Sequence, residues 1–327
     1  MTSQLVISLD FEMMWGVRDK RTIASYGDAV LGGRAAIPEI LRLFRQYNIR
    51  ATWATVGLLF ARNRDEMLDY APALKPSYQR AELSPYDAIR NTIGQNESDD
   101  PWHYGRSLVE AIRDSDGQEL ATHTYSHYYC LESGQTAAEF NADIQAAVQI
   151  AADAGVTIKS MVFPRNQILP DYLDICLSKG IKVFRGNPQT FFYRSRNNDQ
   201  QTLFVRAGRL LDSVLPLDGS HGYVMGHTDN AALDIPASRM LRTTGQGLPE
   251  WFIRLQLLRV KSEMKHAAQR GQMYHLWWHP HNFGRNTEKN LAYLEDLLRF
   301  YAMLHGEYGM KSLAMGDFSG QALSRQK

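Results

Sequence analysis

The chain has 327 residues, of which 44% are hydrophobic, so it can bury the core of one barrel-sized domain. Its formal net charge of +1 is too small for the overall charge to draw the chain to nucleic acid or to an anionic membrane surface. The chain lacks a leader-like start and any run of about 18 apolar residues, which predicts a cytoplasmic protein without an integral membrane segment.

Short apolar runs typical of buried strands alternate with helical patterns along most of the chain. The predicted strands are residues 4–9, 50–57, 118–122, 159–163, 181–184, 223–226, 273–278 and 311–315. The predicted helices are residues 34–48, 106–113, 136–153, 170–179, 249–270 and 291–304. This alternation predicts an α/β fold in which crossover helices connect parallel strands, either as an open sheet or as a closed barrel.

Two stretches interrupt the alternation, residues 62–105 and residues 186–248. We predict that both are insertions in a single domain that spans residues 1–327. Loops of this length in a compact enzyme usually act as lids or bind substrate.

Two carboxylates follow the first predicted strand, Asp10 and Glu12. Residues two apart on a strand point the same way, so both side chains could share one face and supply an oxygen ligand or a base. The structural alternative is that they cap the helix near Gly33 or pair with Arg18.

Two histidines follow the third predicted strand, His123 and His127 in the sequence H-T-Y-S-H. On one helical turn, side chains four apart are neighbours at roughly 5–6 Å between Cβ atoms, so both rings could bind one Zn²⁺-like ion. By itself the spacing also fits an ordinary surface or capping pair.

Polar side chains follow two further strands. Arg165 and Asn166 come after residues 159–163, and the arginine is either a surface charge or the partner of a carboxylate at the same rim. His279 ends the run 273–278, and Pro280 stops the strand there. His281 fits a half-buried structural ring better than His279 does.

In chain order these residues resemble the motifs of the polysaccharide deacetylases, also called NodB-homology or carbohydrate esterase family 4 enzymes. The similar segments are S-L-D-F-E at 8–12, A-T-W-A-T-V-G at 51–57, H-T-Y-S-H at 123–127, F-P-R-N at 163–166 and L-W-W-H at 276–279. The first is a D-x-E variant of the usual motif. The family's Asp-x-Asp-Trp-type motif has no counterpart, and F-R-G-N at 184–187 stands in its place. The resemblance implies a distorted (β/α)7-type barrel with two inserted segments.

The resemblance also implies roles for individual residues. Glu12, His123 and His127 would bind a divalent metal, with zinc the first expectation and cobalt or nickel the alternatives. Asp10 would be the general base, oriented by Arg165, and His279 the general acid. The alternative that Asp10, and not Glu12, is the carboxylate that binds the metal stays open.

The implied activity is removal of an N-acyl group, first of all N-acetyl, from an amino sugar, nucleotide sugar or lipid-linked saccharide, as in O-antigen biosynthesis. We expect Trp15 and Trp278 to stack on the sugar, and Asn166 and His281 to contact it. Two alternatives stay open: an allantoinase-like or formamide hydrolase of the same fold, and a saccharide-binding protein that has lost catalysis. No nucleic-acid-binding motif is present, and the oligomeric state is not predicted.

Overall fold

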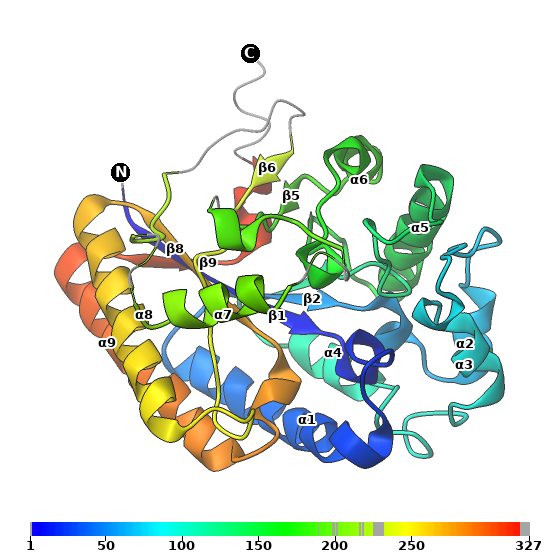
Figure 1. The fold of residues 1–327 in the computed structure, drawn as a ribbon, viewed down its shortest axis with the longest axis horizontal. Coiled ribbons are helices and arrows are strands. Elements are labelled where there is room, and N and C mark those ends of the chain that lie inside the picture. The colour runs from blue at the N-terminus through cyan, green and yellow to red at the C-terminus, as the bar shows by residue number, and fades with distance from the viewer. Residues whose placement is uncertain are drawn as a thin grey trace.

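Nine parallel strands form one curled sheet in the computed structural model, which describes residues 2–188, 190–197, 200, 202–215, 217, 219–224 and 232–320. The strands are β1 (Gln4–Phe11), β2 (Ala51–Thr55), β3 (Gln118–Thr122), β4 (Ser160–Met161), β5 (Val183–Phe184), β6 (Leu233–Asp234), β7 (Arg239–Met240), β8 (Met273–Trp278) and β9 (Lys311–Leu313). Their spatial order is β6-β5-β4-β3-β2-β1-β8-β7, and β9 pairs with the start of β1. The curled sheet and its helices form the distorted (β/α) barrel that the sequence predicted (Figure 1).

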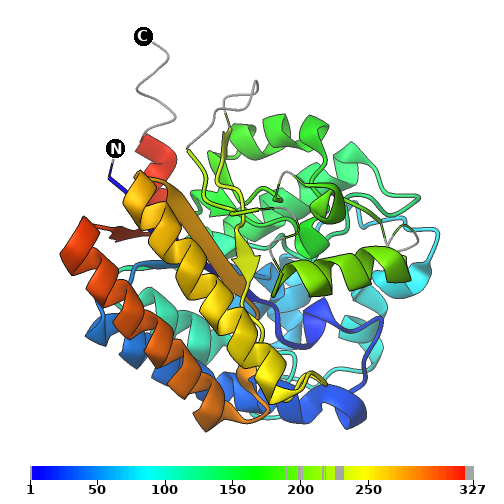
Figure 2. The same ribbon diagram turned by 60° about the vertical axis from the view of Figure 1, so that its left-hand side comes forward.

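The helices are α1 (Ile23–Gln46), α2 (Arg64–Asp69), α3 (Tyr86–Asn91), α4 (Arg106–Arg113), α5 (Ala137–Asp153), α6 (Leu173–Ser178), α7 (Leu203–Asp212), α8 (Glu250–Arg270) and α9 (Thr287–Tyr308). Most of them lie around the outside of the sheet, as the βα alternation requires, whereas α7 lies at the carboxyl ends of the strands and lines a cavity there (Figures 1 and 2). Both views show α8 and α9 side by side. No helix among the described residues is both long and apolar enough to cross a membrane.

Helix ends are set by local chemistry. Thr22 caps α1 and forms a capping box with Ser25, and Thr136 does the same for α5 with Glu139. In α1, Ile37, Ile40, Leu41 and Phe44 are buried with the predicted helical spacing, although the helix begins at Ile23 and not at residue 34. These helices therefore hold the sheet from outside and leave the carboxyl ends of its strands free to carry polar groups.

The two predicted insertions differ from each other. Residues 62–105 place Met67, Ile89 and Tyr104 in the main core. Residues 186–248 contain α7 and also β6 and β7, which extend the sheet and were not predicted. Of the predicted strand 223–226, Tyr223 forms only an isolated bridge with Met273, and residues 225–226 lie outside the described part of the chain.

Candidate active site

Polar side chains gather where the parallel strands end, because all carboxyl ends lie on one rim of the sheet. The contributors are Asp10 near the end of β1 and Glu12 after it, His123 and His127 after β3, Arg165 and Asn166 after β4, Arg185 after β5 and His279 after β8. They line, or lie beside, one cavity of about 760 Å³.

Glu12, His123 and His127 form a buried cluster in which one potential ligand atom from each lies within 4.8 Å of the others. Glu12 Oε2 lies 2.9 Å from His127 Nε2 and 3.4 Å from His123 Nε2. A Cβ atom at Gly16 would sit 1.9 Å from the Glu12 carboxyl carbon, so the carboxylate occupies space that only a glycine leaves open. The structure thus brings together the three side chains that the sequence predicted as metal ligands.

The segment that carries the two histidines is not the helical turn that was predicted. Thr124 and His127 have positive φ angles of 64° and 56°, and the segment is an irregular loop. Asp143 of α5 accepts hydrogen bonds from the backbone N–H groups of Tyr125 (2.7 Å) and Ser126 (3.3 Å) and from the Ser126 hydroxyl. The loop still places the two imidazole centres 5.0 Å apart, because left-handed residues turn the chain back on itself.

The cluster fits a divalent cation of the zinc type. His123 Nδ1 lies 2.8 Å from the carbonyl oxygen of Val162, and donation there leaves Nε2 with a free lone pair. This Nε2 is buried without a hydrogen-bond partner. Two imidazole nitrogens and one carboxylate oxygen are the ligand set of many catalytic zinc sites, which keep a fourth position open.

Electrostatics keeps these groups in the protonation states that a cation needs. Burial, opposed by the carboxylate of Glu12, lowers the pKa of His127 to about 3, so its ring is neutral at pH 7. Burial alone would raise the pKa of Glu12. The charge of His279 and the adjacent imidazoles of His123 and His127 outweigh it, so the pKa of Glu12 lies well below its usual range.

Asp10 is held by Arg185 through two hydrogen bonds, Nη1 to Oδ1 at 2.7 Å and Nη2 to Oδ2 at 2.8 Å. Both side chains are buried. Burial would raise the pKa of Asp10, but the adjacent guanidinium lowers it below the usual value, so the carboxyl is ionised at pH 7.

The predicted pairing of Arg165 with Asp10 is wrong. Arg165 lies in the left-handed region, its guanidinium stacks 4.2 Å from the Tyr129 ring centre, and its Nη2 contacts Asp19 at 2.5 Å. Arg165 therefore lines the cavity without touching Asp10. Sequence reasoning missed Arg185, although its position directly after a predicted strand was a usable signal.

His279 completes the group and is partly exposed. Its Nε2 lies 3.5 Å from Glu12 Oε1 and 3.7 Å from Asp10 Oδ2, and 22% of its side chain is exposed. The ring of His281 stacks on it at 5.1 Å between centres, and burial together with the charge of His279 lowers the pKa of His281 to about 4. An imidazole that is exposed to the cavity and next to two carboxylates can give and take protons.

The tryptophans predicted to stack on a sugar are not at the cavity. Trp15 and Trp278 are both fully buried: the indole N–H of Trp15 donates to the carbonyl oxygen of His103, and Trp278 packs against Phe44 and Phe283. Trp277 lines the cavity instead, between the guanidinium of Arg185 (4.3 Å) and the ring of His279 (5.6 Å). Strand alternation was the missed signal, since residues 277 and 279 share a face. Asn166 and His281 line the cavity.

Comparisons with known proteins point to one family. The family model described as "Polysaccharide deacetylase" matches residues 16–184, a range that contains His123 and His127 but not Asp10, Glu12 or His279. No curated protein matches the sequence at a significant level.

Solved structures share the fold. A protein from Mycobacterium smegmatis described as a polysaccharide deacetylase has a TM-score of 0.62 at 13% identity, over 99% of this chain and 91% of that one. A second, from Pseudomonas aeruginosa PAO1, has a TM-score of 0.55 at 14% identity, again over 99% and 91%. The Puue allantoinase follows with 0.51 at 15% identity, over 97% and 88%. At these identities the likeness concerns the fold alone.

Proposed function

Because the chain belongs to the polysaccharide deacetylase family, we propose that it is a metal-dependent hydrolase that removes an N-acyl group, N-acetyl in the first place, from an amino sugar or saccharide precursor. The observation that carries the proposal is the buried Glu12–His123–His127 cluster. His279 Nε2 lies within 4 Å of the carboxylates of both Glu12 and Asp10.

Glu12, His123 and His127 would hold the cation, with zinc expected first and cobalt or nickel as alternatives. A cation there would supply Lewis-acid activation of the acyl carbonyl and of the attacking water. Glu12 is the better carboxylate ligand, because Asp10 has both oxygens bonded to Arg185 while Glu12 faces the two imidazoles.

Asp10 would take the proton of the attacking water as general base. Its two hydrogen bonds to Arg185 fix the orientation of the carboxylate, and the Ser8 hydroxyl, 3.0 Å from Arg185 Nη1, helps to fix the guanidinium. Arg185 is therefore a positioning residue in this proposal.

His279 would donate a proton to the departing nitrogen, because an amide nitrogen leaves only as an amine. The net reaction adds one water across the C–N bond and releases a carboxylate and an amine. Trp277, Asn166 and His281 line the cavity beside His279 and would contact the sugar. We further propose a cytoplasmic enzyme that acts on precursors of a cell-surface polysaccharide such as an O-antigen.

Metal content tests the proposal first. Purified protein and His127→Ala are dialysed without chelator and analysed for zinc, cobalt and nickel, with the exposed His305→Ala as matched control. We expect near-stoichiometric metal in the wild type and in His305→Ala, and loss of the metal in His127→Ala. Absence of metal from all three, even after reloading, would refute the mechanism.

Acyl release then identifies the reaction. Acetylated amino sugars are incubated with the metal-loaded protein, and acetate, formate and ammonia are measured separately. Acetate supports the deacetylase, formate or ammonia from small amides supports the related hydrolases, and saccharide binding that ignores chelator with no product supports an inactive binding protein.

A further inference from the structure

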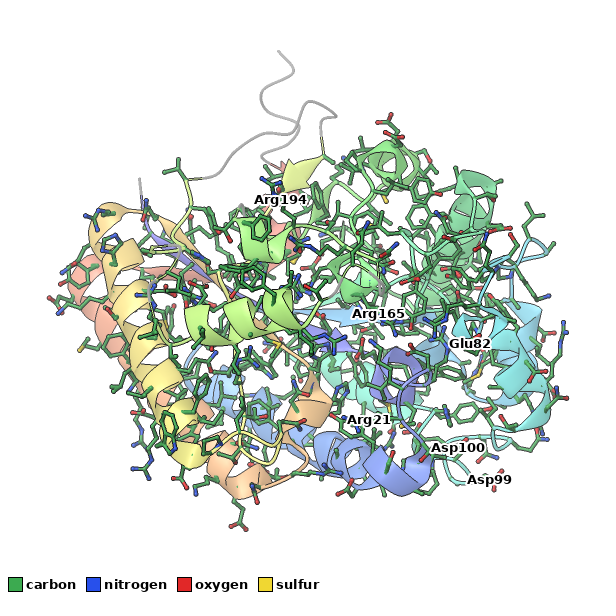
Figure 3. All side chains as sticks on the ribbon, in the orientation of Figure 1. Arg21, Glu82, Asp99, Asp100, Arg165 and Arg194 are labelled. Atoms are coloured by element: carbon green, nitrogen blue, oxygen red, sulfur yellow. The ribbon has the colours of Figure 1, made fainter. Side chains whose placement is uncertain are left out.

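The wall of the active-site cavity is strongly basic. Residues 186–248 contribute Arg194, Arg196, Arg206 and Arg242, and the segment after β1 contributes Lys20 and Arg21. Among the described residues that line the cavity, the acidic ones are Asp10 and Glu12, which belong to the proposed catalytic group. Figure 3 labels Arg21, Arg165 and Arg194, which reach the cavity from three separate segments.

These arginines differ from those with a structural role. Arg165 is paired with Asp19, and Arg239 is paired with Asp212 and Glu263 in the interior. Within the described part of the chain, Arg206 and Arg242 form no ion pair, and Nε of Arg242 is buried without a hydrogen-bond partner. No carboxylate in the described part of the chain therefore balances these two charges.

Further cationic groups crowd the same wall. Among the described residues, the guanidinium of Arg196 donates to the backbone carbonyl oxygens of Phe191, Phe192 and Arg194. Burial and then the charges of Arg196 and Arg206 lower the pKa of Arg209, which also lines the cavity. Like charges that line one cavity repel one another, and a bound anion would relieve this repulsion.

The number and type of these groups indicate the anion. One carboxylate is satisfied by a single guanidinium fork, whereas a phosphate or diphosphate offers several oxygens and at least two charges, and arginine matches its geometry well. The cavity that holds these arginines also holds the proposed catalytic residues, so one ligand can reach both.

We propose that the substrate carries a phosphate or diphosphate group in addition to its N-acyl amino sugar, and that Arg206 and Arg242 bind this group. The proposal rests on the proposed function for the identity of the acylated part. Nucleoside diphosphate sugars and polyprenyl-diphosphate-linked saccharides share this chemistry.

Binding of inorganic pyrophosphate tests the proposal without catalysis. The full chain is stripped of metal by dialysis against a chelator, returned to chelator-free buffer and titrated calorimetrically. We expect Arg206→Gln and Arg242→Gln each to weaken binding by about tenfold or more, since each removes a charge-assisted hydrogen-bond donor. Arg206 is exposed, so its variant does not depend on a repacked interior.

The matched controls are Arg45→Gln and Arg90→Gln, which remove the same charge from exposed positions outside the cavity. They should leave the affinity for pyrophosphate within about twofold of the wild type, because exposed distant charges are screened. No binding by the wild type, or equal weakening in all four variants, would overturn the proposal.

Competition with bound pyrophosphate identifies the source of the phosphate. Uridine diphosphate N-acetylglucosamine is compared with phosphatidylcholine vesicles that contain a polyprenyl diphosphate, and with vesicles that lack it. Displacement by the first supports a soluble substrate, and displacement by the doped vesicles alone supports a lipid-linked one. If neither displaces pyrophosphate, the site binds an inorganic ion only and the proposal fails.

The outcome is separable from that of the proposed function. Arginine-dependent pyrophosphate binding without acyl release under any metal would refute the hydrolase and leave the anion site standing. Acyl release from neutral amino sugars in a protein that does not bind pyrophosphate would support the hydrolase and refute the anion site.

Discussion

Residues in the left-handed region concentrate at the carboxyl ends of the strands. Met13, Thr124, His127, Arg165 and Asn166 have φ angles between 50° and 64°, and all follow β1, β3 or β4. A non-glycine residue in this region costs about 1 kcal/mol or more, so the surrounding packing must impose it. The loops are thereby held in sharp turns that bring Glu12, His123 and His127 together from strands far apart in sequence.

We predict that Arg185→Lys lowers kcat by about tenfold to a hundredfold without loss of metal. Lysine keeps the charge beside Asp10 but cannot reproduce the paired contacts at 2.7 and 2.8 Å, so the carboxylate loses its fixed orientation. Steady-state kinetics and metal analysis of the variant check this. Arg165→Lys is the comparison, and its loss should be smaller because Arg165 contacts Asp19. A larger loss in Arg165→Lys would contradict the assignment.

At the scale of single residues, the sequence predicts which side chains lie at the same rim of the sheet, but it predicts less well which of them form ion pairs. Glu12, His123 and His127 could be proposed because each follows an apolar run, and runs in a βα alternation end on one rim. Arg165 and Arg185 follow adjacent strands of two residues each, β4 and β5, so rim position alone does not distinguish them. The choice depends on the stacking of Arg165 on Tyr129, a contact between segments that no local pattern encodes.

Close packing of α1 against the segment after β8 positions His279 and His281. Within this contact a Cβ atom on Gly33 would lie 2.6 Å from Cα of His281, and one on Gly284 would lie 1.8 Å from the carbonyl oxygen of Ala29. Glycine is required here because two backbones touch, even though Gly33 lies inside a helix, where glycine is normally unfavourable.

We predict that Gly33→Ala destabilises the protein by about 1–3 kcal/mol and lowers activity, because the added methyl group displaces the backbone of His281. Gly306→Ala in α9 is the matched control, since nothing lies within 4 Å of its Cβ position. The control should be stabilising by about 0.5–1 kcal/mol. Urea unfolding measures both, and a stabilising Gly33→Ala would contradict the packing described here.

The periodicity of apolar residues predicts helices and long strands better than it predicts short strands. Residues 106–113 are the bounds of α4 as predicted, because its apolar stripe is clear. The strands β6 and β7 have two residues each, too few for an alternation to show, and the sheet itself selects them as strands.

Asp234 of β6 should make stability depend on pH. Burial raises its pKa from 3.8 to about 7, and its Oδ1 has no hydrogen-bond partner. Between these values the folded chain holds a proton that the unfolded chain has lost, so this group's contribution to stability falls as pH rises from about 4 to about 7.

We predict that Asp234→Asn stabilises the protein by roughly 2–4 kcal/mol above about pH 8 and changes little near pH 4, because an amide has no charge to bury. Unfolding free energies across this range test the prediction. Asp174→Asn, at an exposed position of α6, should show no such pH dependence. A parallel shift at all pH values would mean that packing, not ionisation, explains the effect.

Across the whole molecule, a hydrogen-bonded structural cluster and the proposed active site lie at opposite ends of the sheet. At the amino end, Thr52, Ser160 and the backbone N–H of Gly316 all donate to Glu119, which closes the sheet against the last turn of the described chain. At the carboxyl end the rim stays open to a cavity of about 760 Å³. The proposed metal site lies on this rim and joins β1 to the loop after β3.

The proposed metal site can form only in the folded chain, since Glu12 and His127 are 115 residues apart. A cation that binds the folded state alone stabilises it by mass action, by about 2.7 kcal/mol at a concentration of 100 times Kd. We predict that a chelator lowers the thermal midpoint by roughly 5 °C and that added zinc restores it. His127→Ala should melt lower and ignore chelator, whereas His305→Ala should respond like the wild type. A wild-type midpoint that is indifferent to chelator and zinc would mean that these side chains hold no metal, and catalysis would then have to be sought from Asp10, Arg185 and His279 alone.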